Sequence, residues 1–206
     1  MGDNYVKNLR KRVAREAATL LYTSQEKEYK QAKMRAAETL GIRGLPGNFE
    51  VARELDKIAE EMEGASRKVM LLQMRQEALQ IMRKLEAFHP RLVGSVWRGT
   101  AHHNSDIDII TFSSDPNAIL ERLGEGDFRI SSAEWSSVTK KGEKKSSFHI
   151  HLVLPSGSKV EVVVRSPDRM GSVASCEIYG DKVIGLNYPQ LERVLRENPH
   201  QRFVPP

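Results

Sequence analysis

Cysteine is nearly absent from this chain, since Cys176 is the single one among 206 residues. One cysteine excludes an internal disulfide bond and a zinc site made of cysteine ligands. Long apolar stretches are absent too, because no run approaches the ~20 residues that a membrane-spanning helix needs. The first residues lead into charged, helix-forming sequence instead of an apolar signal region. We therefore expect a cytoplasmic protein that does not associate with membranes.

Basic residues outnumber acidic ones, with 32 lysines and arginines against 27 aspartates and glutamates and a net charge of +5. This excess favours a polyanionic partner such as RNA. The alternative is that the basic side chains only solvate the surface. Aromatic residues make up 6% of the chain and are not interleaved with basic ones, as they are in single-strand binding surfaces. RNA is thus a candidate partner that charge alone does not establish.

Residues 1–88 show helical patterns and no chemical motif. Apolar side chains recur at three- and four-residue spacing, with a break near Tyr22 and another at Gly64. The stretch 66–88 predicts an amphipathic helix of roughly 34 Å. Proline at position 90 ends it, because the residue before a proline is pushed out of the helical region. We expect a helical domain at 1–88 and assign it no role.

Residues 89–206 instead alternate between strands and turns. Five runs have the composition of strands: 92–93, 106–112, 128–138, 147–154 and 159–165. A helix is predicted from Asp115-Pro116 onward, and a charged turn at 140–145. Together with the first part, this predicts an α+β protein whose second domain, 89–206, holds a mixed, mainly antiparallel sheet with helices on one face.

The most informative stretch is 92–112, LVGSVWRGTAHHNSDIDIITF. Asp106 and Asp108 occupy alternate positions of a predicted strand, so both carboxylates point to one face while the isoleucines point into the core. Carboxylates on a rigid strand suit Mg²⁺, which also binds substrate phosphate oxygens. Gly94 lets the backbone approach a ligand closely, and Ser95 offers a hydroxyl and an N–H to phosphate oxygens. The stretch therefore predicts a phosphate and metal site.

Gly94-Ser95, ten intervening residues and Asp106-Ile-Asp108 resemble the signature of the polymerase-beta-type nucleotidyltransferase superfamily. The segment 94–100, with Ser105 before the aspartates, is most similar to the head domain of archaeal CCA-adding enzymes. The resemblance covers roughly 91–165 and is not a full-length match. CCA-adding enzymes carry RNA-binding domains after the head, whereas the extra domain here precedes it. CCA addition itself is therefore not expected.

The resemblance implies a transferase that moves a nucleoside monophosphate from a triphosphate to an acceptor hydroxyl and releases pyrophosphate. Asp106 and Asp108 would be catalytic metal ligands. Glu161 would complete the set, in the place where the family usually has an aspartate. Two Mg²⁺ ions are the expected cofactor, with Mn²⁺ as a substitute. The alternative for Glu161 is an outward-facing position on a half-exposed strand.

The resemblance also implies a nucleotide-binding set, for ATP or another triphosphate. Its predicted members are Gly94, Ser95, Arg98 and Ser105. Two further histidines, His149 and His151, are possible secondary site residues. If 156–158 is a three-residue loop, Leu152 pairs with Val162, and both histidines share the face of Glu161. Solvated histidines are the alternative. His102 and His103 are candidates for contact with nucleotide or acceptor.

The acceptor stays open between RNA, protein and a small molecule. A rival hypothesis is a non-catalytic module that keeps the fold and binds nucleotide or nucleic acid, as an antitoxin-like partner would. Retention of three carboxylates favours the enzyme, because a binding module has no need for a repulsive acidic cluster. The sequence leaves the oligomeric state undetermined.

Overall fold

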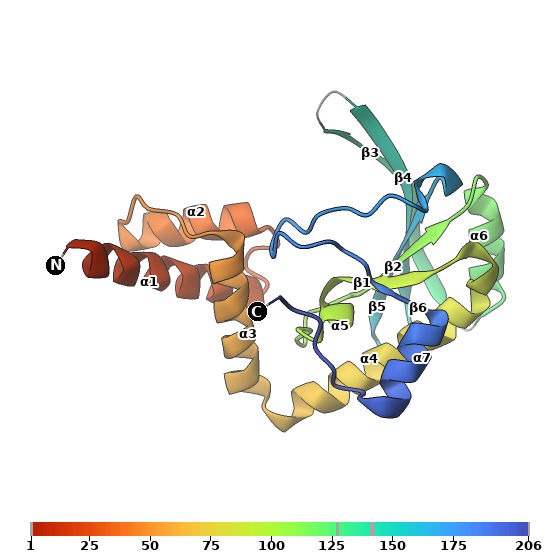
Figure 1. The fold of residues 1–206 in the computed structure, drawn as a ribbon, viewed down its shortest axis with the longest axis horizontal. Coiled ribbons are helices and arrows are strands. Elements are labelled where there is room, and N and C mark those ends of the chain that lie inside the picture. Colours follow the sequence, from red (N-terminus) through yellow and green to blue (C-terminus); the bar gives the residue numbers. More distant parts are fainter. Residues whose placement is uncertain (1, 127, 141–142, 206) are drawn as a thin grey trace.

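The computed structural model describes residues 2–126, 128–140 and 143–205. It confirms the α+β class: a group of helices from the first part of the chain lies beside a mixed sheet formed by the rest (Figure 1). None of the helices in these ranges is long and apolar enough to cross a membrane.

The first three helices share a core of their own. They are α1 (Gly2–Tyr22), α2 (Tyr29–Leu40) and α3 (Asn48–Glu63). Alanine supplies much of the buried surface between them, which lets the helix backbones approach closely. The predicted break near Tyr22 is confirmed, because α1 ends there.

Helix α4 (Ala65–Lys84) belongs to a different core. Its buried Leu71 and Ile81 pack with side chains of the sheet. Gly64, with φ of +52°, separates α3 from α4. The predicted boundary after residue 88 therefore lies at the far end of a helix that packs on the sheet, and we propose to divide the chain at Gly64 instead. The sequence shows that α4 has an apolar stripe, but it does not show whether this stripe packs against the other helices or against the sheet.

The sheet has the strand order β3-β4-β5-β2-β1-β6 in the described part of the chain. Its strands are β1 (Arg91–Val93), β2 (Ile107–Phe112), β3 (Arg129–Lys140), β4 (Glu143–Val153), β5 (Lys159–Arg165) and β6 (Leu186–Asn187). Strands β2 and β5 run parallel, and the other described pairs are antiparallel. The mixed, mainly antiparallel sheet is thus confirmed. The predicted charged turn at 140–145 includes 141 and 142, which lie outside the described residues.

Alternation along β2 and β5 gives the sheet two different faces. Ile107, Ile109 and Val162 are fully buried in the core that also holds α4, α6 (Pro116–Gly124) and α7 (Tyr188–Glu197). The alternate positions point to the opposite, less covered face, which carries Asp108 and Glu161. The packing on one face therefore fixes which side chains are left for chemistry on the other.

The β4–β5 hairpin corrects the predicted register by two residues. Leu152 pairs with Val160, and not with Val162, because the connection spans 154–158 instead of three residues. Leu154 turns into the core, and its N–H donates to the Ser158 carbonyl at 2.9 Å, which closes the longer loop. Because the shift is even, every side chain keeps its predicted face.

Candidate active site

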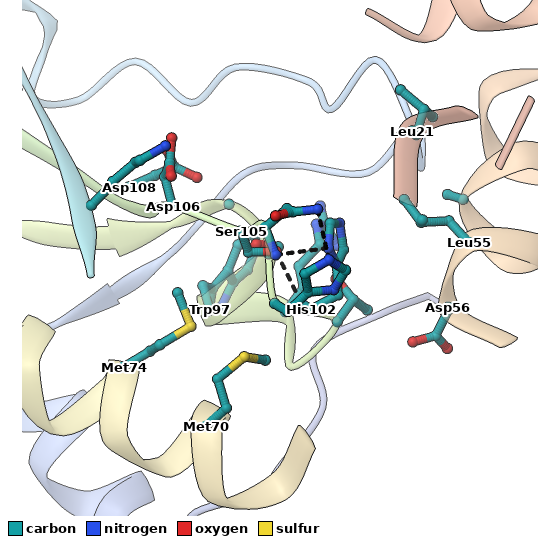
Figure 2. Close-up of a pocket in the computed structure, with 18 of the residues that line it drawn as sticks. Leu21, Leu55, Asp56, Met70, Met74, Trp97, His102, Ser105, Asp106 and Asp108 are labelled. Atoms are coloured by element: carbon teal, nitrogen blue, oxygen red, sulfur yellow. Dashed lines mark hydrogen bonds between the residues drawn. The ribbon is translucent and has the colours of Figure 1, made fainter. Parts of the chain in front are cut away.

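A cleft of about 990 Å³ lies between the N-terminal helices and the sheet. Residues of α1 to α4 form one side, among them Leu55 and Met74. The segments 94–108 and 176–183 form the others. Figure 2 shows Asp106 and Asp108 close together on the sheet side of this cleft.

Most of the residues predicted from the sequence line this cleft. They are Gly94, Ser95, Arg98, Ser105, Asp106 and Asp108. Glu161, His149 and His151 are not among the lining residues. Glu161 stands on β5, next to β2, and the two histidines stand on β4, one strand farther along the sheet. Residues 156–158 of the β4–β5 connection and Lys159 at the start of β5, which were not predicted as part of a site, also reach the cleft.

The carboxylates of Asp108 and Glu161 share one face of neighbouring strands. Asp108 on β2 pairs with Glu161 on the parallel strand β5, and Asp106 precedes β2 directly. Burial, followed by repulsion from Glu161 and Asp106, raises the pKa of Asp108 to about 7. Asp108 thus stands between Glu161 and Asp106 in the fold, and the cost of placing it there shows in its raised pKa. That the three acids form one metal site remains a prediction.

Gly94 lies directly against the carboxylate of Asp108. A Cβ added at Gly94 would stand 1.9 Å from Asp108 Oδ2, and the residue has φ of +70°. Both facts require glycine at this position. Gly94 begins the short helix α5 (Gly94–Arg98), directly after β1. The sequence predicted that the backbone at Gly94 would approach a bound ligand closely. In the structure, it approaches the side chain of Asp108.

Glu161 is held from its other side by a chain of hydrogen bonds. His149 Nδ1 is 2.7 Å from Glu161 Oε1, and His149 Nε2 is 2.8 Å from the Ser147 hydroxyl. His151 Nε2 is 4.0 Å from the same Glu161 oxygen. Both histidines lie on the face of Glu161, as the alternation predicts.

Ser105 supports the turn that leads into Asp106. Its hydroxyl accepts from the His102 N–H at 3.0 Å, and its own N–H donates to the His102 carbonyl at 2.8 Å. These two bonds close a tight turn over 102–105. In the ranges that the structure describes, the hydroxyl proton of Ser105 has no acceptor and can be donated to a ligand in the cleft.

Arg98 requires a revised role. Its side chain is buried, and its guanidinium binds the Asp181 carboxylate at 2.7 and 3.2 Å and the Phe203 carbonyl at 3.0 Å. The rings of Trp97 and Tyr179 lie 4.5 and 4.4 Å from the guanidinium carbon. The positive charge is therefore engaged inside the fold, and we no longer count Arg98 as a phosphate ligand.

Lys159 is a basic side chain that the sequence reasoning overlooked. It is exposed, lines the cleft and stands two positions before Glu161 on β5. Alternation places both side chains on one face of the strand. The sequence already indicates this position, because Lys159 stands two residues before Glu161 in the same predicted strand.

The chain was also compared with known proteins. The family described as "Nucleotidyltransferase domain" matches residues 75–178, which include both cleft aspartates and Glu161. No curated protein matches the chain. Among solved structures, one reporting Cid1 as an RNA terminal uridylyl transferase is similar, with 14% identity over 54% of this chain and 36% of that one, and a TM-score of 0.35. Another solved structure, of Cid1 in complex with the UTP analogue UMPNPP, is 16% identical. The match covers 57% of this chain and 37% of that one, with a TM-score of 0.33.

This chain therefore spans little more than a third of the length of those solved proteins. The family match, in contrast, covers half of the 206 residues and contains the whole of β1, α5, β2 and β5. On that match, the chain belongs to the nucleotidyltransferase-domain family.

Proposed function

We propose that this protein is a metal-dependent nucleotidyltransferase, which moves a nucleoside monophosphate from a triphosphate to an acceptor hydroxyl and releases pyrophosphate. The observation that carries the proposal is the pairing of Asp108 with Glu161 on parallel strands, with Asp106 beside them. A fold that merely binds a ligand gains nothing from two acidic neighbours that raise the pKa of a buried Asp108.

The chemistry of the three carboxylates suits a divalent cation. The pKa of Asp108 is raised to about 7 by burial and by its acidic neighbours, so a nearby positive charge would remove the repulsion. Carboxylate oxygens are the ligands that Mg²⁺ prefers, and Mn²⁺ accepts the same set. Asp106, Asp108 and Glu161 would hold the metal. When bound there, it would polarise the triphosphate and acidify the acceptor hydroxyl.

The remaining residues of the site would bind and orient the substrates. Gly94 and Ser95 stand where the phosphates would meet the start of α5, and Lys159 offers the charge that Arg98 does not. His149 would act as a positioning residue, because its 2.7 Å contact fixes one oxygen of Glu161. Positioning and preorganised charge supply most of the rate enhancement in phosphoryl and nucleotidyl transfer.

The acceptor would enter between the N-terminal helices and the sheet. RNA, protein and small molecules all remain candidates, and the net charge of +5 favours RNA among them. The triphosphate is equally open, with ATP as one choice, and the cytoplasm stays the expected location. The experiment must therefore cover all acceptors and all four nucleotides.

Transfer can be tested with the purified full chain, Mg²⁺ or Mn²⁺, and each α-labelled triphosphate in turn. Reactions would contain total RNA, a protein extract or no addition, with Asp108→Asn as the matched control. We expect label in one acceptor class and stoichiometric pyrophosphate, both lost in the control. Binding of a triphosphate without any transfer would instead establish the non-catalytic module and refute the enzyme.

A further inference from the structure

A second group of metal-ligating side chains lies outside the carboxylate site. Glu63 is the last residue of α3, and His102 and His103 stand in the loop between α5 and β2. One potential ligand atom from each of the three lies within 4.8 Å of the other two. It is the one such trio in the ranges that the structure describes. Both histidines reach the cleft, where Figure 2 labels His102.

Glu63 carries an oxygen that the fold leaves without a partner. Its side chain is 10% exposed, and Oε1 accepts from the backbone N–H of His103 at 3.0 Å and lies 2.9 Å from His103 Nδ1. Oε2 is buried and has no hydrogen-bond partner among the described residues. The Tyr22 hydroxyl lies near this carboxylate, but not in the geometry of a hydrogen bond to Oε2. A buried acceptor without a donor is costly unless something binds it.

The charge around Glu63 also favours a cation. The last turn of α3 has no basic residue, and a helix C-terminus carries partial negative charge. Arg67 is close by, but its guanidinium already binds Asp56 at 2.6 Å, Glu60 at 3.2 Å and the Ala101 carbonyl at 2.8 Å. Among the described residues, Arg67 therefore does not pair with Glu63, whose carboxylate is contacted at Oε1 by His103 and whose Oε2 is left for a cation.

The two histidines determine which cation fits. An imidazole ring offers a nitrogen lone pair to a metal, and His102 places one potential ligand atom within 4.8 Å of those of Glu63 and His103. His102 Nδ1 has only a 3.3 Å contact with the Asn104 N–H, a weak bond that a metal could replace. Two imidazoles and one carboxylate suit Zn²⁺ and similar transition metals, whereas Mg²⁺ prefers oxygen ligands alone.

The required rearrangement is small. Zinc–ligand distances of ~2.1 Å in a tetrahedron separate the ligand atoms by roughly 3.4 Å. Atoms that already lie within 4.8 Å need to close by little more than 1 Å. Asn104 can adjust to this, because its amide bridges His103 Nε2 and the Tyr22 carbonyl and is exposed.

We propose that Glu63, His102 and His103 bind one divalent transition-metal ion such as Zn²⁺, at a site separate from the carboxylates of Asp106 and Asp108. The ion ties the end of α3 to the loop that leads directly into β2. It thereby couples the N-terminal helices to the strand that carries the cleft aspartates. The site does not depend on nucleotidyl transfer.

The test measures metal binding by the full chain after treatment with a chelator. Calorimetric titration with Zn²⁺ should give one tight equivalent per chain, and Co²⁺ should develop the visible absorption of a site with nitrogen ligands. Glu63→Gln, His102→Gln and His103→Gln should each weaken Zn²⁺ binding at least about 100-fold. Two controls, Asp108→Asn and the exposed His89→Asn, should retain it.

A stability measurement separates loss of the site from loss of the fold. Zn²⁺ should raise the melting temperature of the wild type and of both controls, and leave that of the three ligand variants unchanged. Each ligand variant should keep the far-ultraviolet circular dichroism of the wild type. The proposal fails if the wild type binds no Zn²⁺ after chelation. It fails equally if folded Glu63→Gln binds as tightly as the wild type, or if Asp108→Asn loses the ion.

Discussion

Replacing Asp108 by asparagine should make the metal-free protein more stable at neutral and alkaline pH while it abolishes nucleotidyl transfer. The carboxylate is largely enclosed beside Glu161 and Asp106 and lies against Gly94. Ionisation there is opposed by burial first and by the two acidic neighbours second. Asparagine has the same shape and carries no charge, so the repulsion disappears.

The size of the effect follows from the pKa of Asp108, which is about 7 in the folded chain against an ordinary value of 3.8. Between these values the unfolded chain has released the proton and the folded chain has kept it. Stability therefore falls as pH rises through this window, by about 1.4 kcal/mol per pH unit. The difference of about 3 units between the two pKa values corresponds to a loss of about 4 kcal/mol of unfolding free energy above pH 7. About 1–2 kcal/mol of this loss has already occurred at pH 5.

The assay is urea denaturation of the wild type and of Asp108→Asn in EDTA, at pH 5 and pH 8. The variant should gain about 2–3 kcal/mol over the wild type between the two values. Asp115→Asn is a control, since that carboxylate is exposed and caps α6. Mg²⁺ should stabilise the wild type at pH 8 and should not stabilise Asp108→Asn.

The reasoning would be refuted if the difference in unfolding free energy between the wild type and Asp108→Asn were the same at pH 5 and at pH 8. It would mean that the three acids do not crowd one another, and the physical argument for a cation between them would be lost. Stabilisation of both proteins by Mg²⁺ to the same extent would place the ion elsewhere.

Three further changes test the neighbouring structure. Gly94→Ala puts a methyl group against Asp108 and strains a positive φ, so transfer should fall at least ~100-fold and stability by about 2 kcal/mol in thermal melts. Arg75→Met removes a fully buried guanidinium that donates to four backbone carbonyls; we expect a loss of about 3 kcal/mol or more, by urea denaturation. Arg98→Lys breaks the two-bond pair with Asp181 and should lower stability with little change in the KM for the triphosphate. A large rise in that KM at unchanged stability would restore Arg98 as a phosphate ligand.

Local patterns in the sequence predicted which face of the sheet carries Asp108 and Glu161. Period-two alternation fixed the direction of both side chains, and the predicted close approach of the backbone at Gly94 is made to Asp108. The register error in the β4–β5 hairpin did no harm to the faces, since a slip of two residues preserves alternation. It did change the neighbours: Glu161 stands opposite His151 and not Val153.

Pairings between distant segments could not be predicted in this way. The resemblance implied that Arg98 binds nucleotide, yet it pairs with Asp181, 83 residues later. Glu63 approaches His103 across 40 residues, and Glu63 belongs to no motif. Charge in a single sequence carries no information about its distant partner.

These two cases share one physical cause, which also explains why the helical part of the chain looked empty of function. A motif can be recognised only when its residues are fixed by one continuous element, as on β2, where two positions share one strand. Helix α3 contributes one carboxylate, Glu63, to the proposed metal site, and that site is complete only with a loop that the sheet positions. The chemistry that we propose for the N-terminal helices therefore lies where they meet the sheet, at Glu63 and along the cleft, and not within their own sequence pattern.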